Sequence, residues 1–161
     1  IIKLCSSNKK VKMNSDDKFK INLIAKNQED LKVISAYLQD SIVTVRDIVF
    51  LKQNRTFVMI VNRFMWEDAE KKSFGKSKRI RCAVKFEEVI KVESKNINQK
   101  NKNKPLEYLA IKYGTSTEQA CKMMIFFAGD GIITVISETI QVDLQDLGKP
   151  WITKHIPTHK I

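Results

Sequence analysis

Histidine, cysteine, proline and glycine are scarce in this chain of 161 residues, which has two His, three Cys, three Pro and five Gly. Cys5, Cys82 and Cys121 are too few and too scattered for the disulfide framework of a small secreted domain, so we expect a reducing, cytoplasmic environment. The low glycine and proline content argues against a long flexible linker. No apolar run reaches the ~18 residues of a membrane-spanning helix, and we expect neither a membrane span nor a secretory signal.

Familiar catalytic signatures are also missing. The chain contains no G-x-S-x-G, G-x-x-x-x-G-K-[ST] or G-x-G-x-x-G sequence, so we predict no catalytic residues and no cofactor. His155 and His159 have the i,i+4 spacing of a metal pair, but Pro157 between them prevents a regular helix, and we predict no metal site. Cys82 lies on the inward face of a predicted strand, which favours a buried structural thiol over a nucleophile.

Positive charge is abundant, with 29 Lys and Arg against 18 Asp and Glu and a formal net charge of +11. Residues 71–85 contain no acidic side chain, and Arg79, Arg81 and Lys85 are expected to point outward from a strand in this region. Such a basic face could bind phosphates in a salt-dependent way, or it could be a solvated face that discourages edge aggregation. The candidate residues for an anionic ligand are Lys76, Lys78, Arg79, Arg81 and Lys85.

The first twelve residues differ from the rest. Residues 1–12 carry four lysines without clear periodicity, and Met13 would make a natural start. We therefore expect residues 1–12 to be a disordered leader or non-native upstream translation, and residues 13–161 to form a single globular domain.

A capped helix followed by a hairpin is predicted over residues 27–64. Asn27 is a good N-cap residue, and Leu31, Ile34 and Leu38 follow at helical spacing until the helix ends near Asp40. Beta-branched residues then predict strands over 42–51 and 56–64. The second of these strands is apolar on both faces, which is typical of a central strand covered on both sides.

The remaining chain reads mainly as strands joined by turns. Alternation predicts a strand over 79–86 with Ile80, Cys82, Val84 and Phe86 inward, and Gly129-Asp130-Gly131 predicts a tight hairpin turn. An Asn- and Lys-rich segment near residues 95–105 is expected to be a mobile loop. Residues 138–148 fit either a strand or a short helix closed by Gly148, and we favour the helix. Further strands are expected at residues 89–94, 106–113, 122–127 and 132–137.

These elements predict an α+β fold. It would have a mostly antiparallel bent sheet or small barrel of about seven to eight strands, because the strands succeed one another as hairpins. One N-terminal amphipathic helix and a short C-terminal helix would accompany the sheet. Periodicity does not choose between a bent sheet and a barrel.

Polar residues at the end of the first helix and of the hairpin form a second candidate site. If the helix packs on the hairpin, these groups would converge at one end of the domain. A structural role is the favoured explanation, with Arg63 pairing to Asp40 or Glu67 and Trp66 packing in the core. The residues of this polar cluster are Gln39, Asp40, Asn62, Arg63, Trp66 and Glu67.

Several phrases, in this order and spacing, resemble a bacterial family called domain of unknown function 2948, which is typical of alphaproteobacteria. The resemblance implies a small, soluble, cytoplasmic protein and brings no catalytic residues. The phrases are DLKVISAYLQD (30–40), NRFMWE (62–67), FAGDGI (127–132), DLGKPW (146–151) and IPTH (156–159).

The functional expectation is a non-catalytic binding or adaptor module with a basic face for an anionic partner. RNA is the first candidate, and an acidic protein is another. An enzyme with an unrecognised active site and a protein–protein scaffold subunit are the alternatives, and the sequence leaves homo-oligomerisation open.

Overall fold

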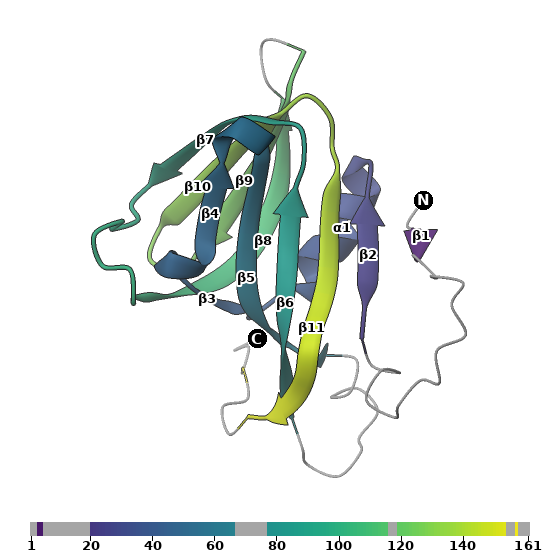
Figure 1. Ribbon diagram of the computed structural model, residues 1–161, viewed down its shortest axis with the longest axis vertical. Coiled ribbons are helices and arrows are strands. Elements are labelled where there is room, and N and C mark those ends of the chain that lie inside the picture. Colours follow the sequence, from purple (N-terminus) through teal and green to yellow (C-terminus); the bar gives the residue numbers. More distant parts are fainter. Residues whose placement is uncertain (1–2, 5–19, 67–76, 116–118, 154–156, 158–161) are drawn as a thin grey trace.

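The computed structural model describes residues 3–4, 20–66, 77–115, 119–153 and 157. These residues form one α-helix and an eleven-stranded sheet whose strand pairs are all antiparallel (Figure 1). The α+β class and the antiparallel sheet are therefore confirmed, whereas the predicted strand count is too low. None of the helices in the described part of the chain has the length and apolar character needed to cross a membrane.

The helix forms where the sequence predicts it. Helix α1 (Gln28–Tyr37) is capped by Asn27, whose Oδ1 accepts a hydrogen bond from the Asp30 backbone N–H at 2.8 Å. Leu31, Ile34 and Leu38 at its apolar stripe are buried. Just before the helix, the short strand β2 (Asn22–Ala25) pairs with β1 (Lys3–Leu4) and was not anticipated from the sequence.

The predicted strand over 42–51 is broken in two. Strands β3 (Ile42–Thr44) and β4 (Ile48–Leu51) both pair with β5 (Thr56–Phe64), and a 3₁₀ turn lies between them. Ile42 is opposite Asn62 and Ile48 is opposite Met59, so six residues of one strand span only three of its partner. The turn absorbs this excess and lets β3 pair with β8 as well.

Strand β5 is central in the sheet, but only one of its faces is buried throughout. Phe57, Met59 and Val61 are buried, whereas Val58 and Ile60 on the opposite face are half-buried. The expectation that both faces are covered therefore holds only in part, since Phe64 on the outer face is also completely buried. No described element packs fully over this outer face, and apolar residues there retain contact with solvent.

The predicted C-terminal helix is wrong, because β11 (Val142–Ile152) is a strand. It pairs on one side with β2 and on the other with β6 (Lys78–Phe86), and Val142 and Leu144 are completely buried. Pairing with both β2 and β6 gives more of the backbone N–H and C=O groups a hydrogen-bond partner than a short exposed helix would. Gly148, with φ of +67°, lies where the register shifts between Leu147 and Trp151 and does not end a helix.

In the other half of the sheet, three consecutive strands form a meander, and the strand that precedes them in the chain pairs with the last of the three. The strands of this half are β8 (Pro105–Thr115), β9 (Cys121–Phe127), β10 (Gly131–Ser137) and β7 (Val89–Lys95). Gly129 and Asp130 both have positive φ between β9 and β10, which confirms the predicted hairpin turn.

The sheet bends so that β4, β5 and β6 face β8, β9 and β10 across one hydrophobic core (Figure 1). Its spatial order runs β1-β2-β11-β6-β5-β3-β8-β9-β10-β7, with β4 beside β5, so it does not close into a barrel. Bending leaves two openings. Helix α1 packs against β2 and β8 at one of them, and the other lies between β4 and β7.

Candidate functional site

The opening between β4 and β7 is bounded at both ends by backbone hydrogen bonds. At one end the Val89 N–H donates to the Arg55 carbonyl at 2.8 Å. At the other end the Arg46 N–H donates to the Lys102 carbonyl at 2.9 Å. Between these closures β4 pairs only with β5, and β7 pairs only with β10. The sheet therefore leaves a short window with an unpaired strand on each side, which we call the β4–β7 window.

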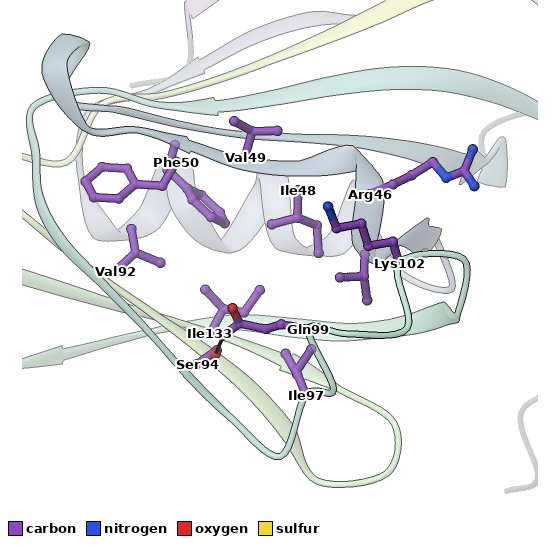
Figure 2. A pocket seen from close by; sticks show the side chains of 12 residues that line it. Arg46, Ile48, Val49, Phe50, Val92, Ser94, Ile97, Gln99, Lys102 and Ile133 are labelled. Carbon is purple, nitrogen blue, oxygen red and sulfur yellow. Dashed lines mark hydrogen bonds between the residues drawn. The ribbon is translucent and has the colours of Figure 1, made fainter.

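A cavity of about 590 Å³ lies behind this window. Its wall is predominantly apolar, with side chains contributed by both halves of the bent sheet (Figure 2). The two uncharged polar side chains of the wall, Ser94 and Gln99, bond to each other, with Gln99 Nε2 donating to Ser94 Oγ at 2.8 Å. The apolar wall includes Ile48, Phe50, Phe57, Val92, Ile97 and Ile133.

Two cations lie at the mouth of the cavity. Figure 2 shows the Lys102 side chain extending over the cavity beside Ile48, whereas the Arg46 guanidinium points away from it. Among the described residues, no carboxylate forms an ion pair with either side chain. The nearest acidic residue in sequence, Asp47, accepts a hydrogen bond from Thr44 Oγ1 at 2.7 Å. The window therefore combines an apolar interior with positive charge at its rim.

Hydrogen bonds join the segment that supplies Lys102 to neighbouring segments, and its expected mobility stays a prediction. Asn96 Nδ2 donates to the Asp130 carbonyl at 3.1 Å, and Ile97 packs against the core. The Val45 N–H donates to the Lys104 carbonyl at 3.3 Å. Its Asn and Gln side chains form hydrogen bonds within the segment and to its neighbours.

The predicted basic face on β6 is less continuous than the sequence suggests. Arg81 is exposed as expected, but Arg79 is only 7% exposed, so its outward orientation into solvent is wrong. Lys85 is partly exposed, and its Nζ lies 3.0 Å from Glu87 Oε1, which raises the pKa of the lysine. Lys78 is half-buried and Lys76 is outside the described residues. The structure thus brings together only part of this candidate site.

Arg79 is buried because neighbouring backbone groups bind it. Its Nη1 donates to the Asp40 carbonyl at 3.0 Å and to the Asn62 carbonyl at 3.1 Å. The guanidinium carbon lies 5.6 Å from the centroid of the Phe64 ring. Burial lowers the pKa of Arg79, an effect opposed by the carboxylates of Asp40 and Glu107. These contacts tie β6 to the segment after α1, which is a structural role.

Most residues of the predicted polar cluster are brought together at one end of the domain. They make separate contacts there. Trp66 Nε1 donates to the Gln39 carbonyl at 2.8 Å, and its ring packs edge-on against Phe64. Arg63 does not pair with Asp40 as proposed; it pairs with the buried Asp146. Glu67 lies outside the described residues.

Other candidate chemistries have little support in the described residues. Cys82 is completely buried, as predicted, and burial together with the neighbouring Asp146 raises the pKa of its thiol. No group of three or more His, Cys, Asp or Glu suitable for a metal occurs among the described residues. His155 and His159 lie outside them.

The sequence interpretation missed Arg46 and Lys102 as site residues. Their segments are 56 positions apart along the chain, and only β3 pairing with β8 brings them together. One signal was present. Residues 95–105 contain four lysines and no acidic residue, a run as one-sided as residues 71–85, and the four lysines, Lys95, Lys100, Lys102 and Lys104, are all exposed.

Comparison with known proteins identifies one family. A family model described as "Protein of unknown function (DUF2948)" matches residues 21–159. No curated protein and no solved structure gave a significant match.

Proposed function

This chain belongs to the DUF2948 family of proteins of unknown function, and we propose that it is a non-catalytic binding module that recognises an anionic partner at the β4–β7 window. The observation that carries the proposal is the Lys102 ammonium, which lies over an apolar cavity and has no carboxylate partner among the described residues. A cation beside a low-dielectric wall attracts anions more strongly than a fully solvated one.

The chemistry of the cavity wall supports binding over catalysis. Within the described residues, its titratable side chains are Arg46 and Lys102, and the wall has no carboxylate, histidine, cysteine or tyrosine. General acid–base catalysis most often uses a histidine or a carboxylate, and neither kind of group is among the described residues of the wall. We therefore rank an enzyme below a binding module.

RNA recognition through Arg81 and Lys85 stays a prediction, and the window is the better supported anion site. Lys85 already has a carboxylate partner in Glu87, so part of its charge is neutralised. Lys102 and the neighbouring loop lysines have no such partner among the described residues. We also propose a cytoplasmic location, supported by the free thiols of Cys82 and Cys121.

The test is charge reversal at Lys102, compared with the same change at a neighbouring lysine. The full chain would be titrated by calorimetry with octanoate and, by fluorescence anisotropy, with a labelled oligouridylate. Lys102→Glu should raise the Kd of the anion at least about tenfold, which is equivalent to about 1.4 kcal/mol of binding free energy. Lys100→Glu is the matched control, because this exposed loop lysine does not line the cavity.

The outcomes separate clearly. A larger loss for Lys102→Glu than for Lys100→Glu supports the window as the anion site. Equal losses would indicate a diffuse electrostatic surface and overturn the proposed site. If neither anion binds the wild-type chain, the proposed function itself is wrong.

A further inference from the structure

We infer that the anion recognised at the β4–β7 window is a small amphiphile, a carboxylate with an alkyl or aryl body that enters the cavity. This inference rests on the proposed function and specifies its ligand class. The carboxylate would pair with Lys102 at the mouth, and the apolar body would contact the partly exposed side chains of the wall, such as Phe50 and Val92.

The size of the cavity fits a small molecule. Ligand sites in proteins typically measure ~300–1,000 Å³ and are lined mainly by apolar side chains with a few polar groups. The cavity here, at about 590 Å³, falls within that range. Ser94 and Gln99 bond to each other, so the described polar side chains of the wall do not require a polar ligand deep in the cavity.

The closures of the window argue against a polymer. An extended peptide or nucleic-acid strand would have to leave the cavity past the Val89–Arg55 or the Arg46–Lys102 hydrogen bond. Strand β4 has only four residues, which offers a short edge for pairing with an added strand. A phosphate polymer would also have no reason to prefer Lys102 over Lys100 or Lys104. A compact ligand with one charged end fits the arrangement better.

Chain length provides the first test on the unaltered protein. Binding of hexanoate, octanoate and decanoate, each below its micelle concentration, would be measured by isothermal titration calorimetry. Each methylene that enters the cavity should lower the Kd about fourfold, the equivalent of ~0.8 kcal/mol per buried methylene. The gain should stop when the chain fills the cavity.

Filling the cavity provides the second test. Ser94 lies opposite Ile133 and faces the cavity, so Ser94→Trp should abolish the chain-length dependence. Glu93→Trp is the matched control, since Glu93 is exposed and lies opposite Thr134 on the other face of the same strand. Melting temperatures of both variants would show whether each is folded.

The results distinguish this inference from the proposed function. A fourfold gain per methylene that Ser94→Trp removes and Glu93→Trp preserves would support the amphiphile. Binding of octanoate or oligouridylate that depends on Lys102 while the Kd is independent of chain length would overturn the inference and leave the proposed function standing. If Ser94→Trp does not fold, the chain-length series on the wild-type protein still decides the question. No binding of any anion would overturn both.

Discussion

Arg63 on β5 and Asp146 on β11 form an ion pair in which both side chains are completely buried. Arg63 Nε lies 3.0 Å from Asp146 Oδ1, and Nη2 lies 2.7 Å from Oδ2. Asp146 Oδ2 also accepts the Ile21 N–H at 2.9 Å. One carboxylate therefore joins β5, β11 and the residue that precedes β2, across β6, which lies between β5 and β11 in the sheet.

Breaking this pair should destabilise the protein severely. Arg63→Met leaves a buried, unpaired carboxylate, and we expect it to lower the free energy of unfolding by about 3–5 kcal/mol. Adding Asp146→Asn should restore part of that loss, because the amide removes the charge and can still accept the Ile21 N–H. Equilibrium urea denaturation of wild type and variants measures these differences.

The exposed pair between Lys91 and Glu93 is the control for that experiment. Its Nζ–Oε1 distance is 2.7 Å, but the side chains are 62% and 55% exposed. Lys91→Ala should therefore leave the free energy of unfolding close to that of wild type. If Arg63→Met proves equally mild, or if Asp146→Asn adds a further loss, the buried pair does not have the role assigned to it.

Neighbouring arginines on β6 should differ in their effect on stability. Arg79→Ala removes two hydrogen bonds to backbone carbonyls and the contact with Phe64, and should cost about 1.5–3 kcal/mol. Arg81→Ala changes an exposed side chain and should stay within about 0.5 kcal/mol of wild type. Thermal unfolding checks both values. Equal losses of stability in the two variants would show that Arg79 is not bound as described. If only Arg79→Ala is destabilised, Arg81 is the suitable position for testing RNA binding, because changing it leaves the fold intact.

Asp143 should make stability depend on pH. Burial and the nearby Glu87 carboxylate raise the pKa of Asp143 above its ordinary value of 3.8, and its Oδ1 has no hydrogen-bond partner. Since the folded state binds this proton more readily than the unfolded state, the charged carboxylate reduces stability at neutral pH. That loss disappears as pH falls through the folded pKa towards 3.8. Asp143→Asn should therefore be slightly more stable than wild type at pH 7, by less than about 1 kcal/mol because the group is partly solvated.

The comparison requires denaturation curves for both proteins across a range of pH. The difference between Asp143→Asn and wild type should shrink as the solution becomes acidic. Glu93→Gln is a control of opposite sign, because Lys91 lowers the pKa of Glu93 in the folded state. This variant should be slightly less stable than wild type at neutral pH, with the difference again vanishing in acid. A pH-independent difference for Asp143→Asn would contradict the assignment.

Local patterns predicted some elements well. Asn27 and the helical spacing of Leu31, Ile34 and Leu38 located α1, because capping and amphipathicity act within a few residues. The alternation of Ile80, Cys82, Val84 and Phe86 gave the buried face of β6 for the same reason. By contrast, residues 138–148 carried both helical and strand periodicities, and only the presence of β2 and β6 on either side of β11 selected the strand.

The sequence by itself determined the capped helix, the buried face of β6, the hairpin at Gly129-Asp130, the excess of positive charge and the family of the chain. Each depends on residues close together in the chain or on their overall composition. Only the tertiary structure decided which cations are neutralised, that Arg79 is buried, and that Arg46 and Lys102 share the mouth of one cavity. These properties depend on strand order and on the bend of the sheet, which bring together residues far apart in sequence, and no local periodicity encodes that pairing.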